Sequence, residues 1–92
     1  MLETFPYDTA DFLRTKEDIV AYLEAVFEDG DPALITAALG DIARAEGMTE
    51  VAKQTGLTRA SLYKALSPEG RPEFVTVLKV IKALGLRLTV AA

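Results

Sequence analysis

The sequence predicts an all-α domain, and three observations support that class. Apolar residues recur at intervals of three and four along most of the chain, which is the period of amphipathic helices. Half of the 92 residues are hydrophobic, as in compact globular domains. A sharp corner separates two short helical patterns in AKQTGLTRASLYKAL, residues 52–66. A chain of this length holds one small core, so we expect one domain over 15–92 after an N-terminal extension over 1–14.

The first half of the chain predicts two helices with clear ends. Thr15 followed by Asp18 is typical of a capping box, and an apolar stripe then runs to Gly30. Asp31 and Pro32 give an N-cap followed by proline at the first helical position, and the next stripe runs to residue 47.

The second of these helices contains a glycine in its interior. Glycine at such a position costs about 1 kcal/mol relative to alanine. We therefore expect a neighbouring helix to approach Gly40 closely, because close approach is what a missing side chain permits.

Three more helices are predicted in the second half, over 48–55, 59–66 and 74–84. Pro68 ends the second of them, since a proline biases the preceding residue away from helix. The SPEGRP stretch that contains Pro68 is a loop by composition. Gly85 ends the last helix.

The two ends of the chain predict less regular structure. LRLTV, residues 86–90, alternates apolar and polar residues with the period of a strand. The chain predicts no other strand, so this segment either pairs with its copy in a second subunit or forms an extended tail. Near the other end, residues 8–13 predict one helical turn.

The corner at residues 52–66 has the pattern of a helix-turn-helix, which we assign to 48–66. Ala52 is small enough for a second helix to cross it closely, and Gly56 suits a left-handed turn. Leu57 is the apolar residue that packs at the turn, and Thr58 is a fitting N-cap for the following helix. Leu62 then faces the core.

The outer face of that helix is small, polar and basic. At about 100° per residue, with Leu62 inward, Ala60 and Lys64 point away from the core. Arg59 is the candidate for bidentate contact with a guanine, with a phosphate contact or a solvated charge as the alternatives. The candidate DNA contacts are Thr49, Lys53, Thr58, Arg59, Ala60, Ser61, Tyr63, Lys64 and Arg71.

Charge is distributed unevenly along the chain, whose net charge is −4. Residues 1–47 hold three basic and eleven acidic residues, a net charge of −8, and residues 48–92 hold seven basic and three acidic residues, a net charge of +4. Such asymmetry indicates nucleic-acid contact by the basic half. Solvation of ordinary helix faces gives the same pattern.

Several classes of protein are disfavoured by composition. The chain has neither cysteine nor histidine, which excludes thiolate zinc sites, cysteine nucleophiles and imidazole acid–base chemistry. We expect no enzymatic activity and no cofactor or metal. The start, MLETFPYDTADFL, is acidic where a secretory signal is basic, and no apolar run reaches membrane-spanning length. We expect a soluble, cytoplasmic protein.

The segment MTEVAKQTGLTRASLYKALSPEGRPEFVTVLKVIKALGLRL resembles the Cro/repressor-type helix-turn-helix domains. More narrowly, it is similar to the addiction-module antidote proteins, and with YLEAVFEDGDPALITAALGDIARAEGM the similarity covers roughly residues 5–90. The resemblance implies a five-helix repressor-like fold, usually dimeric, that binds its own operator and neutralises a RelE/ParE-like toxin. Related domains commonly carry a phosphate-contacting Gln where this chain has Glu50, an acid that repels phosphate.

This resemblance suggests a role for the acidic half. A toxin that acts on RNA needs a basic surface, so acidic side chains would attract it and speed association. The candidate toxin-binding residues are Glu17, Asp18, Glu24, Glu28, Asp29 and Asp31. The alternative is an ordinary solvated helix face.

Two other functions stay open from the sequence. One is a stand-alone transcriptional regulator with the same DNA contacts and no toxin partner. The other is an interaction module that has kept the fold and lost DNA binding. For a dimer, the recognition helices should lie about 34 Å apart and the operator should be an inverted repeat.

Overall fold

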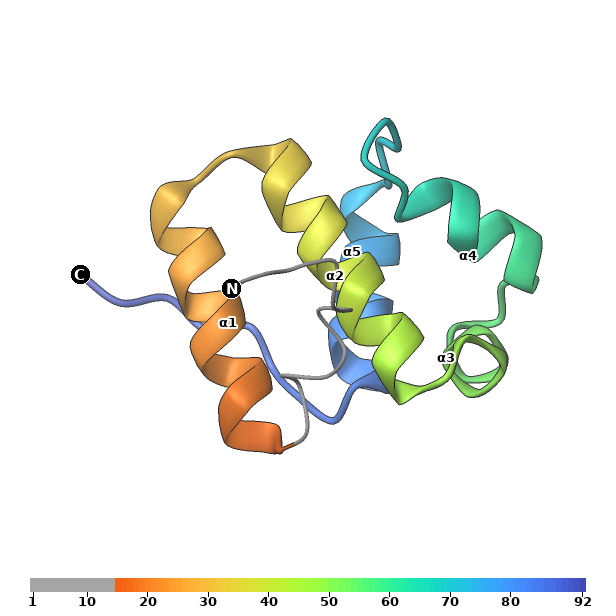
Figure 1. Ribbon diagram of the computed structural model, residues 1–92, viewed down its shortest axis with the longest axis horizontal. Helices are drawn as coiled ribbons and strands as arrows, with labels where there is room; N and C mark the ends of the chain where they lie inside the picture. Colours follow the sequence, from red (N-terminus) through yellow and green to blue (C-terminus); the bar gives the residue numbers. More distant parts are fainter. Residues whose placement is uncertain (1–14) are drawn as a thin grey trace, which may run out of the picture.

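A computed structural model describes residues 15–92, which form five helices (Figure 1). They are α1 (Lys16–Asp29), α2 (Pro32–Glu46), α3 (Met48–Thr55), α4 (Arg59–Ala65) and α5 (Phe74–Ala83). The all-α prediction is confirmed for this range, and α4 and α5 each end one residue earlier than predicted. The N-terminal extension over 1–14 and the helical turn over 8–13 lie outside the described residues.

Local sequence signals set the ends of the first two helices as predicted. The Thr15 hydroxyl accepts a hydrogen bond from the Asp18 N–H at 3.0 Å, and the Asp18 carboxylate accepts one from the Thr15 N–H at 3.2 Å. At the other end of α1, Gly30 takes a left-handed conformation with φ 83°. The Asp31 carboxylate accepts a hydrogen bond from the Ala33 N–H and so caps α2. These groups satisfy backbone donors that a helix end leaves free.

The core is assembled around α2, which packs against α1, α3 and α5. The largest fully buried side chains of the core are Leu39 and Ile42 from α2, Leu62 from α4 and Val80 from α5. No buried side-chain nitrogen or oxygen in residues 15–92 lacks a hydrogen-bond partner. The short helix α4 is therefore held by the same core that organises the long helices.

The strand predicted after α5 is not confirmed within the described residues, and its pairing with a copy in a second subunit stays a prediction. Residues 86–92 contain no strand, and residues 15–92 contain no other strand with which they could pair. Leu86 is half-buried against the core, and its N–H donates to the Ile81 carbonyl at 3.1 Å. Beyond it, the chain runs toward the end of the molecule opposite α4 (Figure 1).

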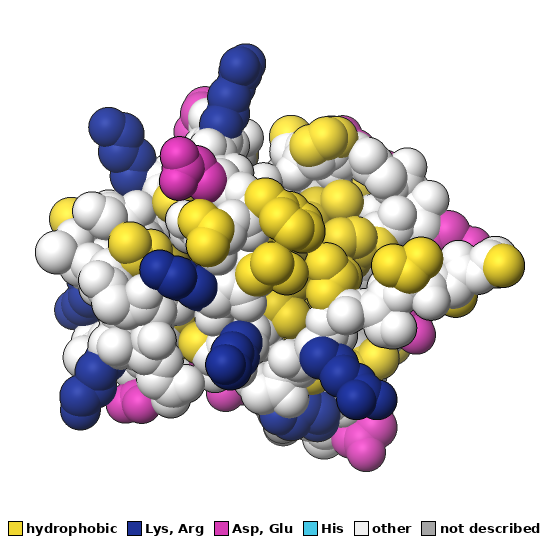
Figure 2. Space-filling view, turned by 180° about the vertical axis from the view of Figure 1, so that it is seen from behind, with side chains coloured by type: hydrophobic (Ala, Val, Ile, Leu, Met, Phe, Trp, Pro, Cys, Tyr) yellow, Lys and Arg dark blue, Asp and Glu magenta, His cyan; other side chains and the backbone are white. Residues whose placement is uncertain are grey.

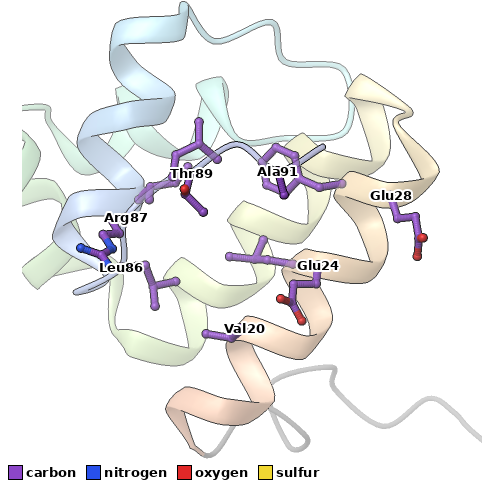
Figure 3. A pocket seen from close by; sticks show the side chains of 11 residues that line it. Val20, Glu24, Glu28, Leu86, Arg87, Thr89 and Ala91 are labelled. Carbon is purple, nitrogen blue, oxygen red and sulfur yellow. The ribbon is translucent and has the colours of Figure 1, made fainter.

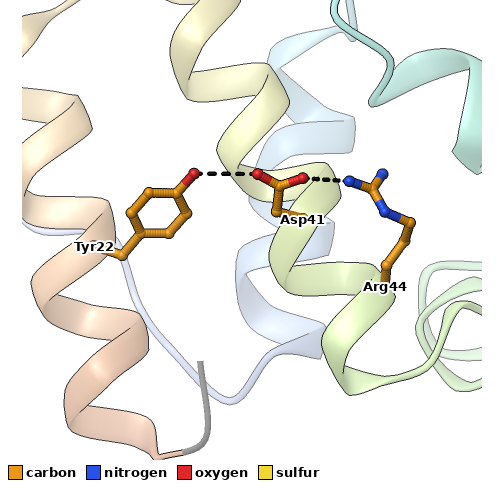
Figure 4. Close-up of polar contacts among 3 residues, drawn as sticks. All are labelled: Tyr22, Asp41 and Arg44. Carbon is orange, nitrogen blue, oxygen red and sulfur yellow. Dashed lines mark hydrogen bonds and ion pairs between the residues drawn. The ribbon is translucent and has the colours of Figure 1, made fainter. Parts of the chain in front are cut away.

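A polar contact joins α1 to α2 (Figure 4). The Tyr22 hydroxyl donates a hydrogen bond to the Asp41 carboxylate at 3.2 Å, and the other Asp41 oxygen pairs with Arg44. Burial raises the pKa of Tyr22 above its usual value of 10.0, and the charge and hydrogen bond of Asp41 raise it further, while the charge of Arg44 opposes the shift. The neutral phenol is thus the form that the fold favours.

We expect Tyr22→Phe to lower the free energy of unfolding by about 1 kcal/mol at neutral pH, the usual loss for one hydrogen bond. Because the folded-state pKa is raised, this contribution is fully present below pH 10.0 and is lost as pH rises through the folded-state pKa. Urea unfolding of both proteins between pH 7 and 11 measures the difference. If the stability advantage of the unchanged protein over Tyr22→Phe increased above pH 10, the raised pKa of Tyr22 would be contradicted.

The described helices also bear on membrane insertion. None of the helices within residues 15–92 combines the length and the apolar character that crossing a bilayer requires.

Candidate nucleic-acid interface

The turn between α3 and α4 is fixed by backbone hydrogen bonds and one glycine. Gly56 has φ 78°, in the left-handed region that the sequence predicted for it. The Leu57 N–H donates to the Ala52 carbonyl at 3.1 Å, and the Thr55 hydroxyl donates to the same carbonyl at 3.0 Å. Ala52 and Thr55 are both buried. The corner is therefore a rigid joint that sets the direction of α4.

The inner side of α4 is anchored by Leu62 and Leu66, which are 0% and 2% exposed. Gly40 of α2 lies directly beneath the end of this helix, where a Cβ atom on Gly40 would be 2.6 Å from the Leu66 carbonyl oxygen. The expected close approach at Gly40 is confirmed, and the neighbour is the C-terminal end of α4. Glycine at position 40 thus lets α4 dock against α2.

All nine candidate DNA-contacting residues are exposed. The α4 candidates share one seven-residue helix, and Thr58 precedes it as the N-cap. Thr49 lies in the first turn of α3 and Lys53 in its last. Arg71 lies in the loop after α4. Within residues 15–92, no hydrogen bond or ion pair joins the α3 candidates to those on α4 or in the loop.

Arg59 and Tyr63 form a unit on the outer face of α4. The Arg59 guanidinium donates a hydrogen bond to the Tyr63 hydroxyl at 3.4 Å, and its central carbon lies 5.7 Å from the centroid of the Tyr63 ring. Cation–π attraction therefore holds the cation along the helix surface. The sequence-based prediction named Arg59 and Tyr63 as separate candidates. Their i, i+4 spacing on a helix is nevertheless the signal for such a pair.

The Thr58 hydroxyl is used within the chain. It accepts a hydrogen bond from the Ser61 N–H at 3.0 Å, as an N-cap does, and donates to the Ser61 hydroxyl at 2.9 Å. The hydroxyl hydrogen of Ser61 is left to donate outward. Thr58 therefore starts the helix. Of the two hydroxyl groups, that of Ser61 can donate to an external group.

A second cluster near the corner was missed by sequence reasoning. A hollow is lined by Gln54 and Thr55 at the end of α3 and by Lys79, Lys82 and Ala83 of α5. These lysines entered the charge count, but only the packing of α3 on α5 brings them to the corner. They add positive charge beside the turn.

Glu50 has a partner on its own helix. The Gln54 side-chain amide donates a hydrogen bond to the Glu50 carboxylate at 2.8 Å, one turn along α3. The Glu50 side chain is otherwise exposed to solvent. The charge of Glu50 is therefore oriented along α3 by Gln54.

The loop after α4 folds back on the end of that helix. The Gly70 N–H donates to the Ser67 carbonyl at 2.8 Å, and the Ser67 hydroxyl donates to the Lys64 carbonyl at 3.0 Å. A Cβ on Gly70 would be 2.3 Å from the Ala65 carbonyl oxygen. This close contact requires glycine and holds Arg71 next to the C-terminal end of α4.

Together these features define a small all-α protein that presents a short, capped helix with a basic outer face. The chain belongs to the family described as probable addiction module antidote protein, whose model matches residues 3–92. Membership in an antidote family implies a toxin partner in general terms. The chain is 46% identical over 84 residues to an uncharacterized protein of Haemophilus influenzae strain Rd, covering 91% of this chain and 87% of that protein. No solved structure matches the chain.

Proposed function

We propose that this chain is a cytoplasmic, DNA-binding antitoxin that neutralises a cognate RelE/ParE-like toxin and represses its own operon. In this proposal α3, the turn and α4 are the helix-turn-helix of a repressor-like fold, and α4 is its recognition helix. The protein acts by binding and not as an enzyme. The observation that carries the DNA part is the exposed, basic face of α4 on a rigid joint.

The chemistry of α4 suits the major groove. A helix fits a groove about 12 Å wide, and the N-terminal residues of a recognition helix approach the base edges. Ala60 and Ser61 are small and exposed there, so they leave room for the bases. Arg59 lies beside them with its guanidinium oriented by Tyr63, which reduces the entropy lost on binding.

We expect Arg59→Ala to weaken binding to an inverted repeat from the protein's own promoter by about 10–100-fold, equivalent to one bidentate base contact. Binding to a scrambled duplex should weaken much less. Fluorescence anisotropy with both duplexes, at several salt concentrations, measures this difference.

Lys64→Ala is the matched control because Lys64 is an exposed cation on the same helix. It should weaken both duplexes alike and lower the salt slope by about 1. If Arg59→Ala also weakened binding to both duplexes equally, Arg59 would contact a phosphate and not a base. No binding to either duplex by the unchanged protein would remove the DNA proposal.

The six acidic candidates for toxin binding occupy three kinds of position. The Asp18 carboxylate accepts a hydrogen bond from the Thr15 N–H and the Asp31 carboxylate one from the Ala33 N–H, so both already serve as caps of helices α1 and α2. Glu24 and Glu28 border a groove with apolar walls. Glu17 and Asp29 are exposed near the two ends of α1. We assign electrostatic attraction of the toxin first to Glu17 and Asp29, which have neither of the other roles.

The toxin part of the proposal is tested by co-expression with the product of the adjacent gene. We expect that product alone to arrest growth and the tagged antitoxin to co-purify with it and relieve the arrest. Reversing the charge of Glu17 and Asp29 together should slow association and flatten its salt dependence. The same reversal at Glu46 and Glu69, both exposed, makes an equal change in net charge elsewhere. No arrest and no complex would leave a stand-alone regulator.

A further inference from the structure

The hollow between α3 and α5 has the chemistry of an anion site. It has a volume of about 460 Å³ and is lined by Gln54, Thr55, Lys79, Lys82 and Ala83. Two of these side chains carry a positive charge and none carries a negative one. A water molecule occupies about 30 Å³, so a phosphate group has room there beside several waters. The lining therefore favours an anion over a cation.

Both lysine ammonium groups at the hollow are available to an external ligand. Lys79 and Lys82 are exposed and lie three positions apart on α5, so they share one side of that helix. Within residues 15–92, no ion pair joins either ammonium group to a carboxylate. The helix α5 lies behind α2 in Figure 1 and so on the near side in Figure 2, where basic side chains lie around the apolar ones.

The α3 wall of the hollow adds one hydrogen-bond donor. The Gln54 amide donates one N–H to the Glu50 carboxylate at 2.8 Å, which leaves its second N–H for another acceptor. The Thr55 hydroxyl is already engaged, because it donates to the Ala52 carbonyl at 3.0 Å. The donors that face a ligand are therefore the two ammonium groups and the Gln54 amide.

The helix ends at the hollow oppose an anion, so the side chains must supply the attraction. Gln54 and Thr55 end α3, and Lys82 and Ala83 end α5. The C-terminal end of a helix carries about half a negative charge. Lysines near such an end also stabilise the helix without any ligand. This structural role is the alternative that an experiment has to exclude.

The larger groove of the molecule has different chemistry. It lies between α1 and residues 86–91, with Glu24 and Glu28 on its α1 side and Arg87 on the C-terminal segment (Figure 3). The two carboxylates repel a phosphate group, which reduces the attraction of the single cation. Phosphate is thus favoured at the hollow and not at the groove.

The place of the hollow on α3 indicates the source of the phosphate. In the proposed function α4 enters the major groove, and the helix before a recognition helix crosses the sugar–phosphate backbone. That helix is α3, which packs against both α4 and α5. The hollow lies where α3 meets α5, directly before the turn at Gly56. Phosphodiester groups of the strand that α3 crosses are therefore the phosphates nearest to it.

The two ends of α3 differ in charge, in agreement with this source. Glu50 in the first turn is an exposed acid that repels phosphate, whereas Lys53 in the last turn directly precedes Gln54. The eight residues of α3 span about 12 Å. Phosphates of one strand recur about every 3.4 Å along the duplex axis, so the two ends of α3 can meet different phosphates. A contact at the last turn compensates for the one that Glu50 disfavours.

We infer that the hollow between α3 and α5 is a phosphate-binding site, in which Lys79 and Lys82 hold a phosphodiester group of the bound duplex. The duplex as the source rests on the proposed DNA binding, whereas the phosphate chemistry of the hollow does not. Neither lysine is among the nine candidate DNA contacts, so the site extends the proposed interface onto α5. Because a phosphate carries no base identity, the contact adds affinity without sequence preference.

Pyrophosphate is the probe for the site in the absence of DNA. In two-dimensional NMR of the full chain, with sodium chloride at matched ionic strength as the reference, it should shift the Gln54 side-chain amide saturably. Changing both lysines, Lys79→Gln with Lys82→Gln, should raise the dissociation constant at least about 10-fold, as loss of hydrogen bonds to a charged group does. Each single change is compared with Arg87→Gln, an equal loss of charge at an exposed residue of the groove, which should have no effect.

The duplex as the source is tested by the salt dependence of DNA binding. The double variant should weaken binding to the operator and to the scrambled duplex alike, by about 5-fold at ~0.15 M salt, and lower the salt slope by about 1. Arg87→Gln should change neither quantity. Pyrophosphate binding without any change in the salt slope would overturn the duplex as the source and assign the site to a free phosphate ligand.

The phosphate site itself has a separate negative result. If pyrophosphate caused no saturable shift at Gln54 and the double variant kept the salt slope unchanged, the site would be overturned. The lysines would then serve only to balance the helix ends, and urea unfolding of the double variant would show a loss of stability. If the unchanged protein bound neither duplex, the proposed function would fail, while the pyrophosphate titration would still decide the phosphate site.

Discussion

Leu62→Ala is expected to lower the free energy of unfolding by about 2–5 kcal/mol, the range for leucine-to-alanine changes in close-packed cores. Leu62 is 0% exposed and is the main core residue of α4. Because α4 has only seven residues, packing of this side chain supplies most of its stability. Urea denaturation monitored by circular dichroism gives the change in unfolding free energy.

Lys64→Ala serves as the control for Leu62→Ala because it shortens an exposed side chain on the same helix. We expect less than about 0.5 kcal/mol for it. In addition, Leu62→Ala should weaken operator binding even where the protein stays folded, since α4 loses its anchor. A loss of stability below 1 kcal/mol would mean that α4 is held mainly by its turn and cap.

Gly40→Val is expected to destabilise the protein by about 3 kcal/mol, the upper end of the usual range for overpacked cores. The new Cβ would be 2.6 Å from the Leu66 carbonyl oxygen, so α2 and the end of α4 must move apart. Leu66 is 2% exposed and cannot shift outward without losing its own packing. Thermal unfolding of the variant and the unchanged protein measures the loss.

Two further variants separate the overlap from helix propensity. Gly40→Ala gains about 1 kcal/mol of helix propensity, so a net loss there measures the overlap directly. Ala33→Val, on an exposed position of α2, gives the cost of a β-branched residue without any overlap. If Gly40→Ala were more stable than the unchanged protein, the approach of α4 to α2 would be looser than the structure shows.

Several features of the site could be read from the sequence because their causes are local. The N-cap roles of Thr15, Asp31 and Thr58 depend on residues two or three positions away. The left-handed conformation at Gly56 follows from the absence of a side chain. Local rules also gave the inward direction of Leu62, because helical periodicity alone places it.

Other features depend on segments that are distant in the chain. The Lys16 ammonium donates to the Leu84 carbonyl at 3.3 Å across 68 positions, and this contact helps to place the C-terminal segment beside α1. The groove between α1 and residues 86–91 arises only from that placement. The strand period of LRLTV is not accompanied by a strand in residues 15–92, because a strand needs a partner edge, which these residues do not supply.

Within residues 15–92, the sequence by itself determined the number and inner faces of the helices, and their ends to within one residue, because capping, glycine conformation and helical period act over a few residues. Only the tertiary structure decided what lies against Gly40, how the Arg59 guanidinium rests on Tyr63, and which acids remain free of structural roles. It also decided that apolar residues of α1 and of the C-terminal segment line one groove. These depend on contacts between segments tens of residues apart, whose geometry is set by packing of the whole core.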